Sequence, residues 1–117
     1  MDLTNKRIFI SGGGGFLGSH LVKALQIRGV GRDQLTFPHK TELDLRRREN
    51  CQTAVEGQDI VIHLAAAVGG IGINREKPGE FFYDNLIMGA QLMEAARLAG
   101  VEKFVAICAY PKFIPIP

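Results

Sequence analysis

Short apolar runs alternate along the chain with longer stretches in which apolar residues recur at helical spacing. The apolar runs lie at residues 8–11, 34–37, 59–64 and 103–108, and each has the length of a buried strand. The run at 59–64 is rich in β-branched residues and apolar at successive positions, which is typical of a parallel strand covered on both faces. This pattern predicts four strands in one sheet.

The stretches between these runs predict helices. Leu17, Leu21 and Leu25 recur every four residues and indicate a helix with one apolar stripe, which ends at Gly29. Helices are also expected at 46–56 and 80–98. The resulting β-α-β-α-β-α-β order predicts an α/β fold: a Rossmann-type parallel sheet with helices on both faces. Such sheets usually have about six strands, so residues 1–117 are expected to form a single, partial domain truncated after the fourth strand.

Composition narrows the range of functions. A net charge of +2 argues against a dedicated nucleic-acid binder. Cys51 and Cys108 lie far apart, without the spacing of a disulfide framework or a metal site. The longest uncharged run, residues 60–74, is shorter than the ~20 apolar residues of a membrane span. We therefore expect a soluble cytoplasmic protein that binds no metal, membrane or nucleic acid.

The chain is rich in glycine, and five of its 14 glycines fall within seven residues after the first strand. A glycine-rich turn between a strand and a helix allows a pyrophosphate to approach the backbone and the free N–H groups of the helix. No lysine follows in the position that a P-loop requires. The loop predicts a dinucleotide site, with a purely structural turn as the alternative. Its residues are Gly12, Gly13, Gly14, Gly15, Phe16, Leu17 and Gly18.

The spacing of Gly12, Gly15 and Gly18 resembles the extended short-chain dehydrogenase/reductase family. The strand end at 63–66, His-Leu-Ala-Ala, resembles a signature of the same family. The resemblance implies that the glycine loop binds a dinucleotide, together with further residues beyond it. These are Asp44, Leu45, Leu64, Ala65 and Ala66. For Asp44, the residues also allow a second interpretation as the N-cap of the predicted helix at 46–56.

The segment after the second predicted strand bears on the choice of cofactor. A carboxylate there usually holds the ribose 2′-OH of NAD, but residues 37–40 read Phe-Pro-His-Lys. A cation suits the 2′-phosphate of NADP instead. NADP(H) is therefore favoured over NAD(H), with His39 and Lys40 as its ligands; the alternative is that Lys40 is an ordinary exposed lysine.

Two further segments are similar to the GDP-L-fucose synthase family: residues 67–74 with 83–86, and the Cys-Ala-Tyr-Pro-Lys run at 108–112. This resemblance implies an NADPH-dependent 3,5-epimerase/4-reductase of a GDP-keto-sugar, a homodimer when full length. It implies an acid/base role for Cys108, whereas the residues alone favour an inert buried thiol at the end of an apolar strand. His63 is interpreted as a packed core histidine. The residues expected to border the sugar are Val68, Gly69, Gly70, Asn74 and Asn85.

The reducing pair of that family, Tyr-x-x-x-Lys, does not occur in the chain, because Ile87 follows Tyr83 and Ile114 follows Tyr110 at the fourth position. The family's Ser/Thr before the cysteine motif is also absent, since residues 105–107 are Val-Ala-Ile. Three alternatives therefore stay open beside the cofactor-binding part of a fucose-synthase-like enzyme. They are a non-catalytic dinucleotide-binding module, an inactive truncated relative, and a UDP-hexose 4-epimerase or dehydratase.

Overall fold

The computed structural model describes residues 2–38, 42–64 and 78–107. In chain order the elements are β1 (Ile8–Ser11), α1 (Phe16–Ile27), the 3-10 helix η1 (Arg32–Gln34), β2 (Leu35–Thr36), α2 (Arg48–Val55), β3 (Ile60–His63), α4 (Pro78–Ala99) and β4 (Lys103–Ala106).

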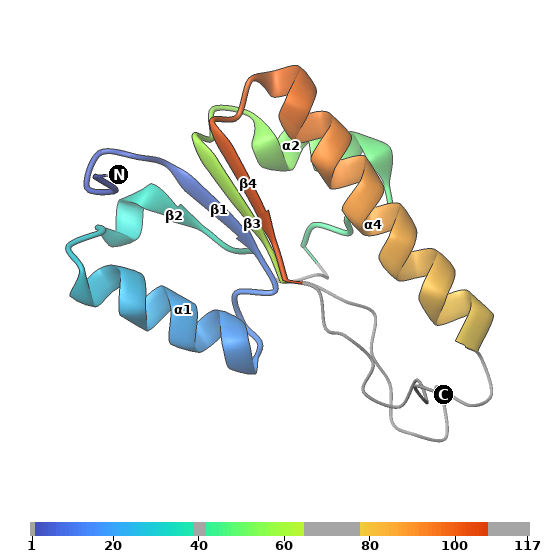
Figure 1. The fold of residues 1–117 in the computed structure, drawn as a ribbon, viewed down its shortest axis with the longest axis horizontal. Coiled ribbons are helices and arrows are strands. Elements are labelled where there is room, and N and C mark those ends of the chain that lie inside the picture. The colour runs from blue at the N-terminus through green and yellow to red at the C-terminus, as the bar shows by residue number, and fades with distance from the viewer. Residues whose placement is uncertain (1, 39–41, 65–77, 108–117) are drawn as a thin grey trace, which may run out of the picture.

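The four strands form one parallel sheet in the order β2-β1-β3-β4. Figure 1 shows α1 on one side of this sheet and α2 with α4 on the other. The predicted α/β fold, a Rossmann-type parallel sheet with helices on both faces, is therefore confirmed. The chain leaves β1 toward β2 on one side and later returns to β3 on the other, which places a topological switch point between β1 and β3.

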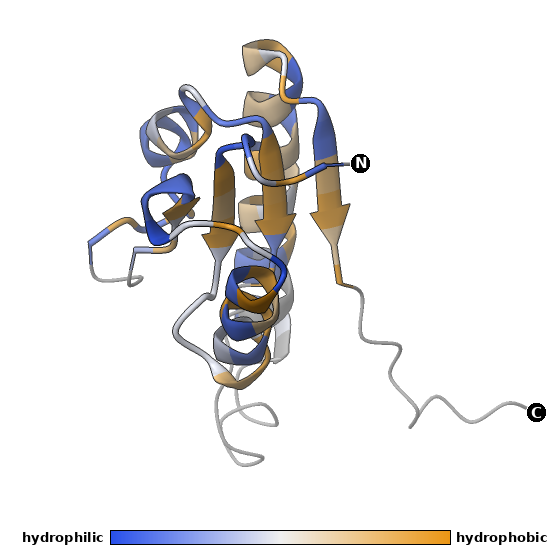
Figure 2. Cartoon of the chain, turned by 90° about the vertical axis from the view of Figure 1, so that its left-hand side faces the viewer, coloured by the Kyte–Doolittle hydropathy of each residue, from blue (hydrophilic) through white to orange (hydrophobic). Residues whose placement is uncertain are grey.

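Each face of the sheet has its own apolar core, because successive strand residues point to opposite faces. Ile8, Ile10 and Ile60 pack with Val22 and Leu25 of α1. Phe9 and Val61 pack in the other direction, against α2 and α4. In Figure 2 the strands are accordingly hydrophobic along most of their length. The sheet is thus packed on both faces, and the glycine loop follows β1 at its carboxyl edge.

Several element boundaries differ from the predicted ones by one or two residues, among them the start of β3 at Ile60 and the end of β4 at Ala106. The second strand is only Leu35–Thr36, because Gln34 belongs to η1 and its side chain accepts the N–H of Gly31. Helix α2 starts at Arg48, and its N-cap is Arg47. The expectation that Asp44 caps this helix is wrong. Helix α4 begins at Pro78 rather than at residue 80, because proline is well suited to the first turn of a helix.

The apolar stripe of α1 also differs in one residue from the predicted stripe. Gly18, Val22 and Leu25 are buried, whereas Leu17 is 51% exposed. The predicted apolar spacing is correct for Leu25, but it places Leu17 in the core, and there it is wrong. Leu17 lies in the first turn of α1, next to the glycine loop.

None of the helices in the described part of the chain combines the length and the apolar character needed to cross a membrane. Within residues 2–38, 42–64 and 78–107, no group of three or more His, Cys, Asp or Glu side chains is placed to hold a metal ion.

Candidate functional site

The glycine loop follows β1 at the carboxyl edge of the sheet and makes a tight turn. Gly12 has a φ of 76°, a left-handed conformation that glycine adopts without steric cost. The N–H of Gly15 donates to the Gly12 carbonyl at 3.1 Å and closes the turn. Gly12 therefore gives the loop the backbone conformation that the tight turn requires.

Gly18 brings the first turn of α1 against this loop. A Cβ at position 18 would overlap the Gly12 carbonyl and lie 2.6 Å from the Gly13 Cα. Real Cβ atoms do not approach backbone atoms this closely, so only glycine allows the helix to pack here. The contact is with the backbone of the glycine loop itself.

The amino-terminal end of α1 has unused hydrogen-bond donors. Its N-cap, Gly15, has extended backbone angles and supplies no side-chain acceptor, and the first turn contains no acidic residue. The first N–H groups of a helix lack partners within the helix and carry its positive dipole end. Phe16 is 83% exposed beside them. Loop and helix end together are suited to bind an anion such as a pyrophosphate.

Phe37, at the end of β2, packs directly on the glycine loop. A Cβ on Gly13 would overlap the Phe37 Cβ and lie 2.9 Å from its Cγ. The Arg32 guanidinium lies 5.9 Å from the centre of the Phe37 ring. Sequence reasoning included Gly13 but missed Phe37. The only available signal was an aromatic residue at the point where β2 ends.

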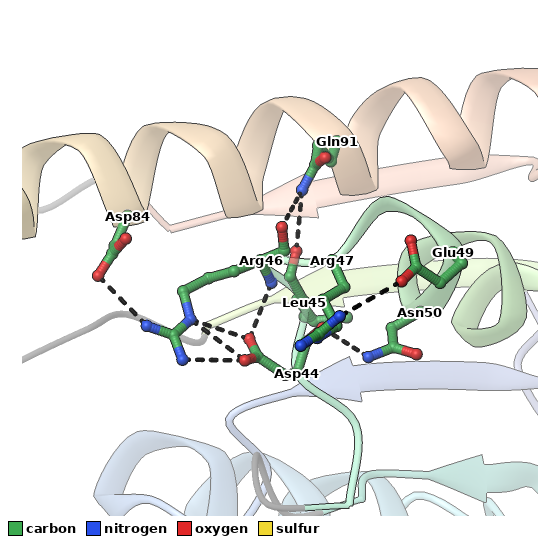
Figure 3. Close-up of polar contacts among 8 residues, drawn as sticks. All are labelled: Asp44, Leu45, Arg46, Arg47, Glu49, Asn50, Asp84 and Gln91. Atoms are coloured by element: carbon green, nitrogen blue, oxygen red, sulfur yellow. Dashed lines mark hydrogen bonds and ion pairs between the residues drawn. The ribbon is translucent and has the colours of Figure 1, made fainter.

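Asp44 belongs to a polar network in front of α2, which Figure 3 shows. Arg46 donates from Nε to Asp44 Oδ1 at 3.0 Å and from Nη2 to Oδ2 at 2.9 Å. These bonds, with that from the Arg46 N–H, hold the pKa of Asp44 below its ordinary value. Asp44 is therefore an anion at neutral pH, and Arg46 directs two N–H contacts at each of its carboxylate oxygens.

The same network connects this segment to α4. Arg46 Nη1 lies 3.6 Å from Asp84 Oδ2, and Gln91 Nε2 donates to the carbonyls of Leu45 and Arg46 at 3.3 and 2.9 Å. Leu45 itself is buried in the core with α2 and α4. Asn85, which follows Asp84, is exposed on α4. The predicted cofactor residues Asp44 and Leu45 thus lie beside the part of α4 that carries a predicted substrate residue (Figure 3).

Ser11 and His63 end the two central strands and contact each other. Ser11 Oγ lies 2.7 Å from His63 Nδ1 and accepts the Leu64 N–H at 3.0 Å. Ser11 is 3% exposed, so it is not accessible as a nucleophile. Sequence reasoning did not single out Ser11, and His63 is half-buried with a polar partner rather than simply packed in the core.

Burial lowers the pKa of His63 below its ordinary value, because it disfavours the charged imidazolium. The unfolded chain therefore binds a proton more readily than the folded chain, and the free energy of unfolding falls as the pH drops through about 6.5. We expect urea denaturation midpoints to decrease from pH 7.5 to 5.5. The decrease should be smaller in His63→Gln, and an equally steep decrease in that variant would contradict this assignment.

Cys51 is a buried thiol of the core between α2 and the sheet. It donates to the Leu45 carbonyl at 3.2 Å, and burial raises its pKa to about 11. A thiol in this state is not a nucleophile at neutral pH.

Several predicted site residues lie outside the described part of the chain, and their predicted roles stay predictions. They are His39, Lys40, Ala65, Ala66, Val68, Gly69, Gly70, Asn74 and Cys108.

The sequence of this chain is similar to proteins of a nucleotide-dependent enzyme family. The profile described as NAD dependent epimerase/dehydratase family matches residues 8–117. The chain is 35% identical to GDP-mannose 3,5-epimerase of Arabidopsis thaliana over 93% of its length and 33% of the relative. It is also 35% identical to GDP-L-fucose synthase of Sinorhizobium fredii over 98% of its length and 37% of the relative.

The fold of this chain is also similar to that of a solved enzyme structure. The GDP-mannoheptose C4 reductase from Campylobacter jejuni with NADP bound superposes with a TM-score of 0.81 at 30% identity, covering 91% of this chain and 33% of that one. The chain spans about a third of the length of the relatives that it matches. It belongs to the NAD dependent epimerase/dehydratase family.

Proposed function

We propose that this chain binds NADP(H) at the glycine loop and forms the cofactor-binding part of an epimerase/reductase acting on a GDP-sugar. The observation that carries the proposal is the uncapped helix end at Gly15, held against the loop by glycine-only contacts. The loop and helix end fit a dinucleotide because N–H groups and a positive dipole end face the place of a pyrophosphate. When bound, the nicotinamide of such a cofactor supplies or accepts a hydride.

The residues of this chain would bind and orient the cofactor rather than perform the reduction. The N–H groups at the start of α1 would hold the pyrophosphate, and the Asp44 carboxylate would accept hydrogen bonds from the adenine side. Neither tyrosine in the 117 residues is followed by lysine at the fourth position. We therefore assign cofactor binding to this stretch and leave the protonation of the ketone to residues that it does not contain.

The preference for NADP(H) rests on His39 and Lys40, which follow β2 with no carboxylate at residues 37–40. A relative of known structure that holds NADP supports it. The GDP-sugar class is supported by relatives named GDP-mannose 3,5-epimerase and GDP-L-fucose synthase, both at 35% identity. Because these identities are equal, a GDP-mannose-epimerase reaction is a second candidate beside the fucose-synthase reaction. The fucose-synthase reaction would use Cys108 as an acid/base group, and the sugar would lie near Val68, Gly69, Gly70, Asn74 and Asn85.

Gly15→Ala tests the proposal, because the protein's own structure does not require glycine at this position. Gly15 has a φ of −80°, and an added Cβ would contact the Gly12 carbonyl at 3.4 Å. The variant is expected to fold, while its methyl group blocks the approach of a pyrophosphate. We expect the Kd for NADPH, measured by calorimetric titration, to rise at least about tenfold, which corresponds to about 1.4 kcal/mol.

Gly79→Ala is the control, since Gly79 lies outside the glycine loop, in the first turn of α4, and a Cβ there meets nothing within 4 Å. It adds the same methyl group at the start of another helix and should leave Kd unchanged without lowering stability. A flat NADPH titration of the folded wild-type chain would overturn the proposal. Equal Kd values for NADPH and NADH would overturn only the preference between the two cofactors.

A further inference from the structure

The hydroxyl of Ser11 joins the ends of the two central strands. Ser11 of β1 pairs in register with His63 of β3. The N–H of the next residue, Leu64, lies 3.1 Å from the Ser11 carbonyl and 3.0 Å from the Ser11 hydroxyl oxygen. One residue of β1 therefore holds this amide with both its backbone and its side chain.

This contact lies between two segments of the candidate site, the glycine loop and the end of β3. Gly12, directly after Ser11, starts the glycine loop, and Leu64 is the first residue beyond β3 and a predicted cofactor contact. The contact lies at the switch point between β1 and β3, where α/β sheets bind ligands beyond the carboxyl ends of their strands. The Ser11 hydroxyl thus fixes the distance between the glycine loop and the end of β3, the two segments that flank this switch point.

His63 extends the connection to two further elements. Its Nδ1 is 2.7 Å from Ser11 Oγ, and its ring centre lies 6.5 Å from that of Phe104 on β4. On α4, a Cβ added to Gly89 would lie 3.7 Å from His63 Nε2, which is an ordinary van der Waals contact. The imidazole thus lies between the hydroxyl and α4, and its position limits where the hydroxyl can point.

A purely structural interpretation accounts for only part of this arrangement. The other three residues of β1 are Ile, Phe and Ile, and a buried hydroxyl among them costs free energy unless it is paired. The Ser11 hydroxyl is paired with His63 Nδ1 and with the Leu64 N–H, which belong to the strand end that leads into the site.

We propose that Ser11 and His63 are a positioning pair that sets the spacing between the glycine loop and the strand end at Leu64, and so the affinity for the dinucleotide. The inference rests on the proposed function. Ser11 is 3% exposed and directly precedes the glycine loop, so the proposed role is one of positioning and not of direct contact with the ligand. It acts through Gly12 and Leu64.

The test is the Kd of the 117-residue chain for NADPH, measured beside its urea unfolding. Ser11→Ala removes the hydroxyl that holds the Leu64 N–H and should raise Kd about five- to tenfold. Ser11→Thr retains a hydroxyl on a β-branched residue suited to a strand and should restore Kd to within about twofold of wild type. If Ser11→Ala does not fold, Ser11→Cys replaces it, because its thiol forms weaker hydrogen bonds and should give an intermediate Kd.

Gln34→Ala is the matched control at the opposite end of the sheet. Gln34 Nε2 donates to the carbonyls of Leu3 and Lys6 at 3.0 and 2.8 Å, just before β1. This variant should lower the free energy of unfolding and leave Kd unchanged. The inference is overturned if Ser11→Ala, or Ser11→Cys in its place, binds NADPH as wild type does, or if Gln34→Ala weakens binding equally. If the folded wild-type chain binds no dinucleotide, it is the proposed function that fails.

Discussion

Gly18→Ala is expected to destabilise the chain by about 1–3 kcal/mol, as overpacking of a close contact does, and to abolish NADPH binding. The added Cβ would overlap the Gly12 carbonyl and crowd the Gly13 Cα. These are backbone atoms that cannot rotate away as a flexible side chain can. Relief requires α1 to move off the loop, and this movement displaces the N–H groups that would hold the pyrophosphate.

Urea denaturation and an NADPH titration of the same sample measure the two effects of Gly18→Ala. Gly79→Ala again serves as the control, since it adds an identical methyl group at the start of α4, where nothing lies within 4 Å. A wild-type denaturation midpoint in Gly18→Ala would show that the helix does not need to approach the loop this closely.

Leu92→Ala should cost about 2–5 kcal/mol, the range for removing a fully buried leucine side chain. Leu92 is 0% exposed and lies in the core that α4 shares with Phe9 and Val61 of the sheet. Single domains have a free energy of unfolding of only about 5–15 kcal/mol. A substantial fraction of the variant should therefore be unfolded at 37 °C.

Thermal unfolding followed by circular dichroism measures this loss. Met93→Ala is the control, because Met93 is the next residue of α4 but is 53% exposed. Its effect should stay within about 0.5 kcal/mol. Equal effects of the two substitutions would contradict the assignment of the buried face of α4.

The elements of the fold could be predicted because their signals are local. The apolar runs at β1 and β3 reflect burial of both faces of a parallel strand. The glycines that follow α1, α2 and α4 have positive φ angles, which glycine adopts without steric cost. The boundary at Asp44 was missed for a physical reason. Its carboxylate accepts the Arg46 N–H and then binds the Arg46 side chain, so the acceptor expected to start α2 is engaged one turn earlier.

The contacts of the site could be predicted only in part. The glycine loop has a spacing that can be read directly, whereas its contact with Phe37 joins residues 24 positions apart in the chain. The Ser11–His63 hydrogen bond spans 52 positions and depends on the register of two strands. An apolar strand that ends in serine does not indicate which neighbouring strand will supply the partner.

The packing of Phe37 on Gly13 has a consequence for how this sequence can diverge. The two positions share one volume, because a Cβ at position 13 would occupy the place of the Phe37 side chain. Because the closest overlap is with the Phe37 Cβ, any residue other than glycine at 13 requires either glycine at 37 or a shift of the backbone. In related sequences, the residue types at positions 13 and 37 are therefore expected to change together and not independently.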